Sequence, residues 1–521
     1  MSMQIALLLA LVIGAILSLG VIALMARDRH ARVIGLLLET ASLAALALAL
    51  AGLGEVLTSV SYTANLLTTQ GAGLSLRMDV VSLTMLALVG FIGWVVLRYA
   101  RTYMAEELGR ARFIGGLGLA LASVLLFVGA GNLLQLVTAL IATSLCVNRL
   151  LLFYPERAAA RRAARKQFIT ARLADVALIA AAVLLTAAYG TPDIATILDA
   201  ARSGVGGPLV AGAIACLALA AVITSAQFPL HGWLSEVMEA PTPVSALLHA
   251  GVINAGGFLL IRFADVLLLS PATLAGLVMI GGFTALFGGL VMLTQPAVKT
   301  SLAWSTVAQM GFMIMQCGLA LFPLALLHIL AHSLYKAHSF LASGGAVERI
   351  AANRRPGPVA IPDAKAVGAA FLAALGIFTA MSIGFDFQSK SPQAIALGAI
   401  LIFGVAYLLA QGLAGSAPGM LMRRMAVYSL AASAGYFVLH TLAELLTRGT
   451  LPAAPQPGPL EWVLIGLAVL SFGLVAIAQA MFPLWANHPA AAGLRVHLSN
   501  GLYANAVLDR LLGGWQQRRP L

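Results

Sequence analysis

Long apolar runs alternate with short polar segments along almost the whole chain. About fifteen of these runs approach the roughly 20 residues that a helix needs to cross a bilayer. They lie near residues 3–25, 33–53, 78–98, 113–131, 132–153, 168–189, 208–228, 243–263, 272–294, 298–319, 321–347, 366–384, 392–414, 420–443 and 460–484. Backbone polar groups in the bilayer core must bond within their own segment, so these runs are expected to be helices. The pattern predicts an all-α integral membrane protein with about 15 transmembrane helices.

The composition supports this class and excludes others. The 521 residues are 61% hydrophobic and 10% charged, whereas soluble domains are about 45–50% apolar and about 25% charged. The sequence contains no glycine-rich dinucleotide or phosphate-binding motif. Cys146, Cys216 and Cys317 lie inside apolar runs without CxxC spacing, so they are expected to be small core residues. We expect neither a cofactor nor a metal in this chain.

The positive charges fall in particular loops. Basic clusters follow the predicted spans one, three, five, eleven and thirteen, namely Arg27, Arg29 and Arg32; Arg98, Arg101, Arg110 and Arg112; Arg149, Arg157, Arg161, Arg162, Arg165 and Lys166; Arg349, Arg354, Arg355 and Lys365; and Arg423 and Arg424. Short loops rich in Lys and Arg mark the cytoplasmic side. All five spans are odd-numbered, which predicts an N-terminus outside and a cytoplasmic tail. That tail, 485–521, is either an amphipathic helix on the membrane or a partner, or an ordered tail packed on the loops.

The predicted eleventh span carries three ionisable side chains on one face. His328, His332 and Lys336 are spaced four apart, while His338 points away from them. A charge at mid-bilayer costs at least ~2.5–3.5 kcal/mol on insertion scales, so each such residue needs a reason. Histidine titrates near neutral pH and a desolvated lysine loses its charge readily, which favours a proton or charge relay. Structural hydrogen bonding and a zinc site are the alternatives, although HxxxH lacks the glutamate of HExxH.

Prolines interrupt the helix where the seventh predicted span meets the eighth. Pro229 is followed by prolines at 241 and 243, and each one breaks helical hydrogen bonding. Broken helices at membrane depth line protein or a wet cavity, as in transporter ion sites. The polar residues around these prolines are His231, Glu236, Glu239 and His249. We expect His249 to continue a polar path and the two glutamates to shape an entrance or an inter-helix contact. The alternative is a kinked helix with satisfied polar groups.

Two further charges stand at the starts of spans. Lys299 opens the tenth predicted span, where a lysine that extends to the interface is an equal alternative to a role in ion movement. Asp175 lies three residues after Arg172, and an i,i+3 pair would lower the cost of both charges. A structural pair is the favoured interpretation if the two lie near the surface.

Three segments resemble the signature of a known superfamily: SAQFPLHGWLSEVMEAPTPVSALLHAG, KTSLAWSTVAQMGFM and HILAHSLYKAHSFLASG. They are similar to the proton-translocating, antiporter-like subunits of respiratory complex I and of Mrp sodium/proton antiporters, over roughly residues 75–350. The resemblance implies two inverted five-helix repeats with broken helices near 229 and near 384–392, and an axis of buried charges that carries protons. It implies N-terminal helices at 1–112, repeats at 113–263 and 264–414, and C-terminal helices and tail at 415–521. Matching positions are Asp175, His249, Lys299, His328, His332 and Lys336.

The first half departs from this superfamily. Ile141 stands where a glutamate is usual, and Thr224 stands where a lysine is usual. The aspartate expected before Lys299 is also missing, since Ala297 and Val298 precede it. The loss of the glutamate–lysine pair counts against a proton pump of complex I.

A narrower resemblance involves NRLLLFYPERAAARRAARKQF, YKAHSFLASG and HLSNGLYANAVLDRLLGGW. These segments are similar to the DabB family, the membrane subunits of bacterial inorganic carbon accumulation complexes. The resemblance implies an inner-membrane location and a DabA-like cytoplasmic zinc partner that resembles a β-carbonic anhydrase. This chain would then be a transporter subunit and no enzyme, conducting protons or Na⁺ so that the partner hydrates CO2 to bicarbonate in one direction. The alternatives are a complex I- or Mrp-type pump or antiporter subunit, and a membrane anchor that conducts nothing.

Overall fold

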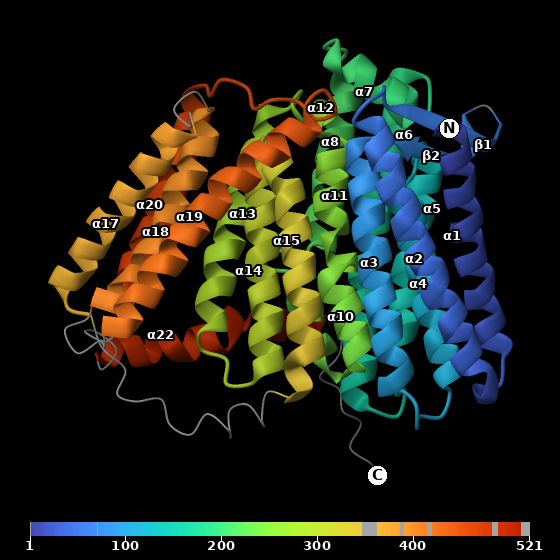
Figure 1. Ribbon diagram of the computed structural model, residues 1–521, viewed down its shortest axis with the longest axis horizontal. Coiled ribbons are helices and arrows are strands. Elements are labelled where there is room, and N and C mark those ends of the chain that lie inside the picture. The colour runs from blue at the N-terminus through green and yellow to red at the C-terminus, as the bar shows by residue number, and fades with distance from the viewer. Residues whose placement is uncertain are drawn as a thin grey trace.

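The computed structural model describes residues 2–69, 71–345, 362–385, 390–413, 419–481 and 488–511. Twelve helices in these ranges are long and apolar enough to cross a membrane. Beside them run the shorter α8 (Pro208–Thr224) and the pair α14 (Val298–Gly318) and α15 (Phe322–Leu341), which are not among the twelve (Figure 1). The prediction of a helical integral membrane protein is confirmed, whereas the count of about 15 spans stays a prediction.

The first part of the chain forms α1 (Ser2–Met25), η1 (Asp28–His30), α2 (Ala31–Val56), β1 (Tyr62–Thr69), β2 (Ala72–Met78), α3 (Val80–Tyr103), α4 (Arg110–Val128), α5 (Leu133–Leu151), α6 (Ala158–Tyr189) and α7 (Ile194–Arg202). The second part, after α8, forms α9 (Gly232–Glu236), η2 (Val237–Glu239), α10 (Thr242–Ala250), η3 (Val252–Asn254), α11 (Ala255–Arg262), α12 (Ala264–Leu267), α13 (Pro271–Met292), η4 (Ala342–Gly345), α17 (Ala364–Gly384), α18 (Pro392–Leu413), α19 (Gly419–Thr447), α20 (Pro459–Ala480), α22 (Pro489–Ser499), η6 (Gly501–Tyr503) and α23 (Ala504–Leu511).

A β-hairpin that the apolar pattern did not predict lies between α2 and α3. β1 and β2 pair antiparallel, with an irregularity between Asn65 and Leu67. Asn132 holds the hairpin to the bundle, because its amide nitrogen donates to Gly73 O at 2.7 Å while its amide oxygen caps α5 at Gln135 N. A side chain that accepts from an N3 amide is the usual way to begin a helix. The same residue therefore starts α5 and fixes the hairpin.

The chain is broken between α8 and α11. After α8, the stretch 225–231 has no regular helix, and Pro229 lies in it, so the predicted first break is confirmed. A second interruption at η3 divides α10 from α11, and Asn254 there donates to Ser333 Oγ on α15 at 2.9 Å. The interruption at η3 is thus hydrogen-bonded to α15, the helix that carries His328, His332 and Lys336.

α17 and α18 are each long and apolar enough to span. The second break was expected near 384–392, in the segment between them, and it stays a prediction. Residues 386–389 of that segment lie outside the described part. The two helices lie side by side within a bundle that also contains α19 and α20 (Figure 1). Apolar runs alone do not distinguish a break within one helix from a loop between two helices.

Glycines bring α13 and α14 into backbone contact. A Cβ on Gly281 would lie 2.5 Å from Met315 N, and a Cβ on Gly311 would lie 2.5 Å from Ala285 N. Gly288 and Gly318 meet the opposite backbone in the same way. Small residues at helix interfaces in membranes permit this close approach.

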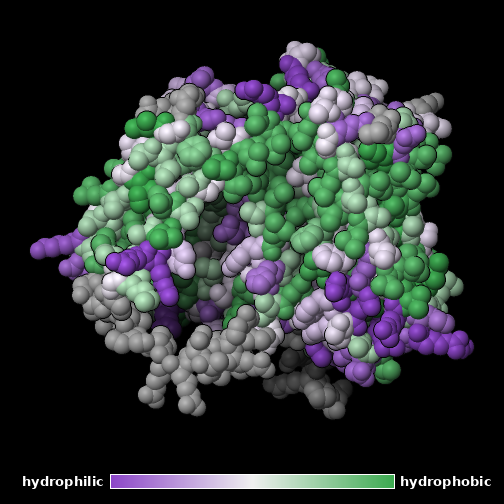
Figure 2. Space-filling model, in the orientation of Figure 1, coloured by the Kyte–Doolittle hydropathy of each residue, from purple (hydrophilic) through white to green (hydrophobic). Residues whose placement is uncertain are grey.

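Apolar and polar surfaces are separated on the molecule. Green hydrophobic residues cover the middle of the visible face, and purple hydrophilic residues gather at its upper and lower edges (Figure 2). The start of α1 lies at the upper edge, while α22 and the loops joining α1 to α2, α3 to α4 and α5 to α6 lie at the lower edge (Figure 1). These three loops carry basic clusters, so the described clusters share one face. Which side of the membrane this face meets stays a prediction; Arg349, Arg354 and Arg355 lie outside the described residues.

Candidate functional site

A row of buried polar side chains runs through the second half, on α10, α14 and α15. Lys336 is fully buried and its Nζ donates to Leu302 O at 3.0 Å and to Ser305 Oγ. His249 Nδ1 lies 3.1 Å from Thr306 Oγ1, and its ring stacks on Phe340 with centroids 4.3 Å apart. The groups that face Lys336 are oxygens without charge, and the described residues give it no ion pair.

Two histidines continue this row along α15. The rings of His328 and His332 have centroids 6.1 Å apart, as expected from spacing of four along one helix face. Both ring nitrogens of His332, and the Nε2 atoms of His249 and His328, are buried without a protein partner among the described residues. His338 is exposed, so the prediction that it points away is confirmed. The structure thus brings together His249, His328, His332 and Lys336.

Lys299 lies at the edge of this row. It is half-buried at the start of α14, and its Nζ donates to Thr242 Oγ1 at 3.3 Å. Thr242 begins α10, so the contact joins the lower ends of two helices. The position fits a lysine at the interface as well as it fits an entry to the row.

Asp175 belongs to a different group, in the first half. Its carboxylate pairs with Arg172 at 2.6 Å, and Arg172 also donates to Ser144 Oγ on α5. Asp175 and Thr224 line the same small cavity of about 40 Å³. Ile141 accepts from Ser144 Oγ at 2.9 Å through its carbonyl, and its side chain packs against the hydrophobic core. The predicted i,i+3 pair is present, and it lies apart from the row of Lys336.

The broken segment after α8 carries a buried ion cluster. His231 has no exposed surface and lies among aromatic rings, with its centroid 4.9 Å from that of Trp304 and 5.7 Å from that of Phe228. Glu236 pairs with Lys166 at 2.5 Å and lies 3.7 Å from Arg162. The side chain of Glu239 lies outside the described residues. Glu236 therefore makes the inter-helix contact that one interpretation of the sequence favoured.

Lys166 is a functional candidate that sequence reasoning missed. Its side chain is 2% exposed, although the sequence placed it in a basic loop with five arginines. The structure puts it on α6, which begins at Ala158, ten residues before the predicted span. The alanines that alternate with these basic residues are a signal for an amphipathic first turn of this helix, and could have indicated that one cation faces inward.

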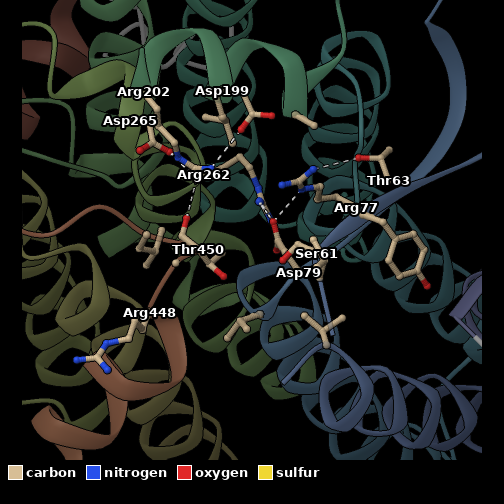
Figure 3. Close-up of a pocket in the computed structure, with 18 of the residues that line it drawn as sticks. Ser61, Thr63, Arg77, Asp79, Asp199, Arg202, Arg262, Asp265, Arg448 and Thr450 are labelled. Atoms are coloured by element: carbon tan, nitrogen blue, oxygen red, sulfur yellow. Dashed lines mark hydrogen bonds and ion pairs between the residues drawn. The ribbon is translucent and has the colours of Figure 1, made fainter. Parts of the chain in front are cut away.

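A cavity of about 840 Å³ opens at the upper edge, between the hairpin, α7, α11 and the loop after α19 (Figure 3). Asp79 lies in its wall, where Arg262 binds it at 2.6 and 3.2 Å and Arg77 binds it at 3.0 Å. Burial alone would raise the pKa of Asp79, but the Arg262 and Arg77 guanidiniums hold it well below its usual range. Arg202 in the same wall pairs with Asp265 at 3.0 Å. Burial raises the pKa of Asp265, and Arg202 opposes that rise.

Another charged group lies on α19, in the second half. Glu444 pairs with Lys390 and with His440, whose Nε2 is 3.1 Å from the carboxylate. Lys390 lies 54 residues before Glu444, so this pair could not be found from local spacing. In the described part of the chain, no three His, Cys, Asp or Glu side chains are grouped so that they could hold a metal ion. The zinc alternative for His328 and His332 therefore lacks a third ligand there.

Comparisons with known proteins place this arrangement in a class. Residues 130–355 match the family described as NADH:quinone oxidoreductase/Mrp antiporter, TM, and residues 68–114 match the NADH-ubiquinone oxidoreductase (complex I), chain 5 N-terminus. Fold and buried row together define a membrane subunit of the ion-translocating, antiporter-like class.

Sequence relatives identify the family within this class to which the chain belongs. The probable inorganic carbon transporter subunit DabB2 of Halothiobacillus neapolitanus is 38% identical over 446 residues, covering 84% of this chain and 80% of the relative. A probable DabB of Hydrogenovibrio crunogenus is 47% identical over 270 residues, covering 51% of this chain and 52% of that relative. The chain belongs to the DabB family of antiporter-like membrane subunits. The structure of an Mrp complex from Dietzia sp. shares the fold, with a TM-score of 0.61 and 24% identity over 98% of this chain and 60% of that one.

Proposed function

We propose that this protein is the membrane subunit of an energy-coupled inorganic carbon pump, in which protons move through the row of Lys336, His332, His328 and His249. The main support for this function is the row of buried side chains itself. Buried polar atoms are almost always hydrogen-bonded, yet four ring nitrogens in the row have no protein partner among the described residues. Such atoms can bind water or exchange a proton, which a purely structural histidine does not need to do.

Lys336 is suited to release and regain a proton. It is held by a carbonyl and a hydroxyl, so losing its charge leaves no carboxylate unpaired. A salt-bridged lysine would have to break an ion pair for the same step. His332 lies one helical turn away on the same face and provides the next acceptor. Na⁺ is the alternative ion, bound by the hydroxyl and carbonyl oxygens near Lys336.

The partner is proposed from the DabB relationship. Relatives in this family are named as transporter subunits. A cytoplasmic, DabA-like zinc protein resembling a β-carbonic anhydrase would hydrate CO2, with this chain in the bacterial inner membrane supplying the energy of an ion gradient. The chain then needs no cofactor, and the zinc resides in the partner. Co-purification of a zinc protein supports this assignment, whereas co-purification of many redox subunits favours a complex I-type pump.

Replacement of Lys336 tests the row. With the partner subunits co-expressed, Lys336→Ala is expected to lower inorganic carbon uptake by about tenfold or more, as for loss of a proton-transfer group. His338→Ala, an exposed histidine two residues away, is the matched control and should retain wild-type uptake. Unchanged uptake by an assembled Lys336→Ala complex would instead favour the membrane anchor that conducts nothing.

A further inference from the structure

The C-terminal helix binds the broken segment through a buried lysine. Lys166 Nζ is 2.5 Å from Asp509 Oδ1, 2.5 Å from Glu236 Oε1 and 2.8 Å from Asn505 Oδ1. Asn505 Nδ2 donates to the same Glu236 oxygen at 2.7 Å. Asn505 and Asp509 are four residues apart on α23, so one face of this helix makes both contacts.

Glycines let the tail lie against the break. A Cβ on Gly232, at the start of α9, would lie 1.9 Å from Asn505 Oδ1. Gly501 is buried with φ +57°, and a Cβ there would lie 3.2 Å from the Trp304 ring and 4.0 Å from His231 Nε2. The turn η6 therefore covers His231, and α23 covers Lys166. Both covered residues lie where the break ends at the face that carries the basic loops.

The attachment is polar and separable. α23 has no buried residue, and Val507 on it is 56% exposed. When Asn505 and Asp509 leave, Lys166 keeps Glu236 as its counter-charge, so release does not leave a buried charge alone. Removing the whole partner set of a buried ion would be far more costly.

We propose that η6 and α23 form a movable cover, which closes the His231–Lys166 end of the broken segment while docked and opens it during transport. This inference rests on the proposed function, because an opening is useful only if ions move past the break. Release of the cover exposes His231, whose two ring nitrogens have no protein partner among the described residues, to the solvent of that face.

A disulfide can lock the cover. The Cβ built on Gly232 lies 3.3 Å from Asn505 Cβ, near the ≈ 3.5–4.5 Å span of disulfides. The pair Gly232→Cys with Asn505→Cys also removes the amide oxygen that a Gly232 side chain would meet. The natural Cys146, Cys216 and Cys317 are replaced by alanine, and the partner subunits are kept. The two single-cysteine variants are the controls.

Oxidation of the paired variant is expected to lower inorganic carbon uptake at least fivefold relative to its reduced form, with recovery on addition of dithiothreitol and no change in the controls. Equal uptake by the cross-linked and reduced forms overturns the proposal, since the cover then has no need to move.

A second measurement does not depend on transport. In the cysteine-free background, Ser235→Cys on α9 reports access to the break through labelling by a membrane-impermeant maleimide in vesicles that expose the basic face. Adding Asn505→Ala with Asp509→Asn should raise the labelling rate several-fold, while the exposed Val507→Ser control should not. Unchanged labelling overturns the cover. If labelling rises but the parent complex moves no ions, the proposed function fails and the cover stands.

Discussion

The two halves of the molecule treat buried charge differently. In the second half, Lys336 is held by oxygens without charge, and the neighbouring histidines keep unpartnered nitrogens. In the first half and at its upper edge, cations face carboxylates, as in Lys166 with Glu236, Arg172 with Asp175, and Arg262 with Asp79. Ion pairs fix a charge, whereas neutral partners let it change. The contrast separates the row of Lys336, whose polar partners carry no charge, from the ion-paired groups, which also include Lys390 with Glu444 in the second half.

The largest expected effect concerns stability at the upper edge. Arg262→Gln should lower the free energy of unfolding by about 3–5 kcal/mol, because it takes a partner from the buried Asp79 carboxylate. Lys336→Gln should cost about 1 kcal/mol, since it loses hydrogen bonds to neutral groups. Thermal unfolding of both variants in detergent measures the difference. Equal losses would mean that the two halves do not differ in how they hold charge.

An intermediate effect is expected at Arg202, which has one buried and one exposed partner. Asp265→Asn should cost about 1–3 kcal/mol, because Asp265 is 6% exposed and paired. Asp199→Asn should change stability by less than about 0.5 kcal/mol, since that carboxylate is 72% exposed and screened by water. Both variants are compared by the same unfolding assay. A larger loss for Asp199→Asn would show that exposure does not set the value of these pairs.

The smallest effect is expected when a whole pair is removed from the first half. Arg172→Gln combined with Asp175→Asn should leave carbon uptake within about twofold of wild type, because deleting both partners leaves no lone buried charge. Asp175→Asn alone serves as the reference for a stranded arginine. If the double variant loses as much uptake as Lys336→Ala, the first half conducts too and the contrast is wrong.

Features that depend on spacing between nearby residues could be predicted from the sequence. Spacing of four placed His328, His332 and Lys336 on one face, and Pro229 marked the break, because both depend on neighbours within a few turns of helix. The spanning helices followed from apolar runs for the same reason. The proline pattern placed His249 on a polar path, but its contact with Thr306 could not be predicted from spacing, since that residue lies 57 positions away.

Contacts between distant segments were not predictable. Asn505 reaches Lys166 across 339 residues, and a tail of moderate polarity gives no sign of where it docks. The hairpin was missed because its strands are partly polar and lie between two predicted apolar spans. Lys166 was interpreted as a loop charge because the apolar run was taken to begin at Phe168, ten residues after the first residue of α6.

The glycine contacts between α13 and α14 limit how this molecule can move. Where backbones touch at Gly281 and Gly311, no layer of side chains exists over which the helices could slide. The two helices therefore form one stiff rod, and a tilt of either is a tilt of both. Under the proposed function, any displacement that accompanies a change of charge at Lys336 would fall at the interruption between α10 and α11, which Asn254 connects to α15. The α13–α14 pair is then the rigid element, and the interruption between α10 and α11 is the hinge.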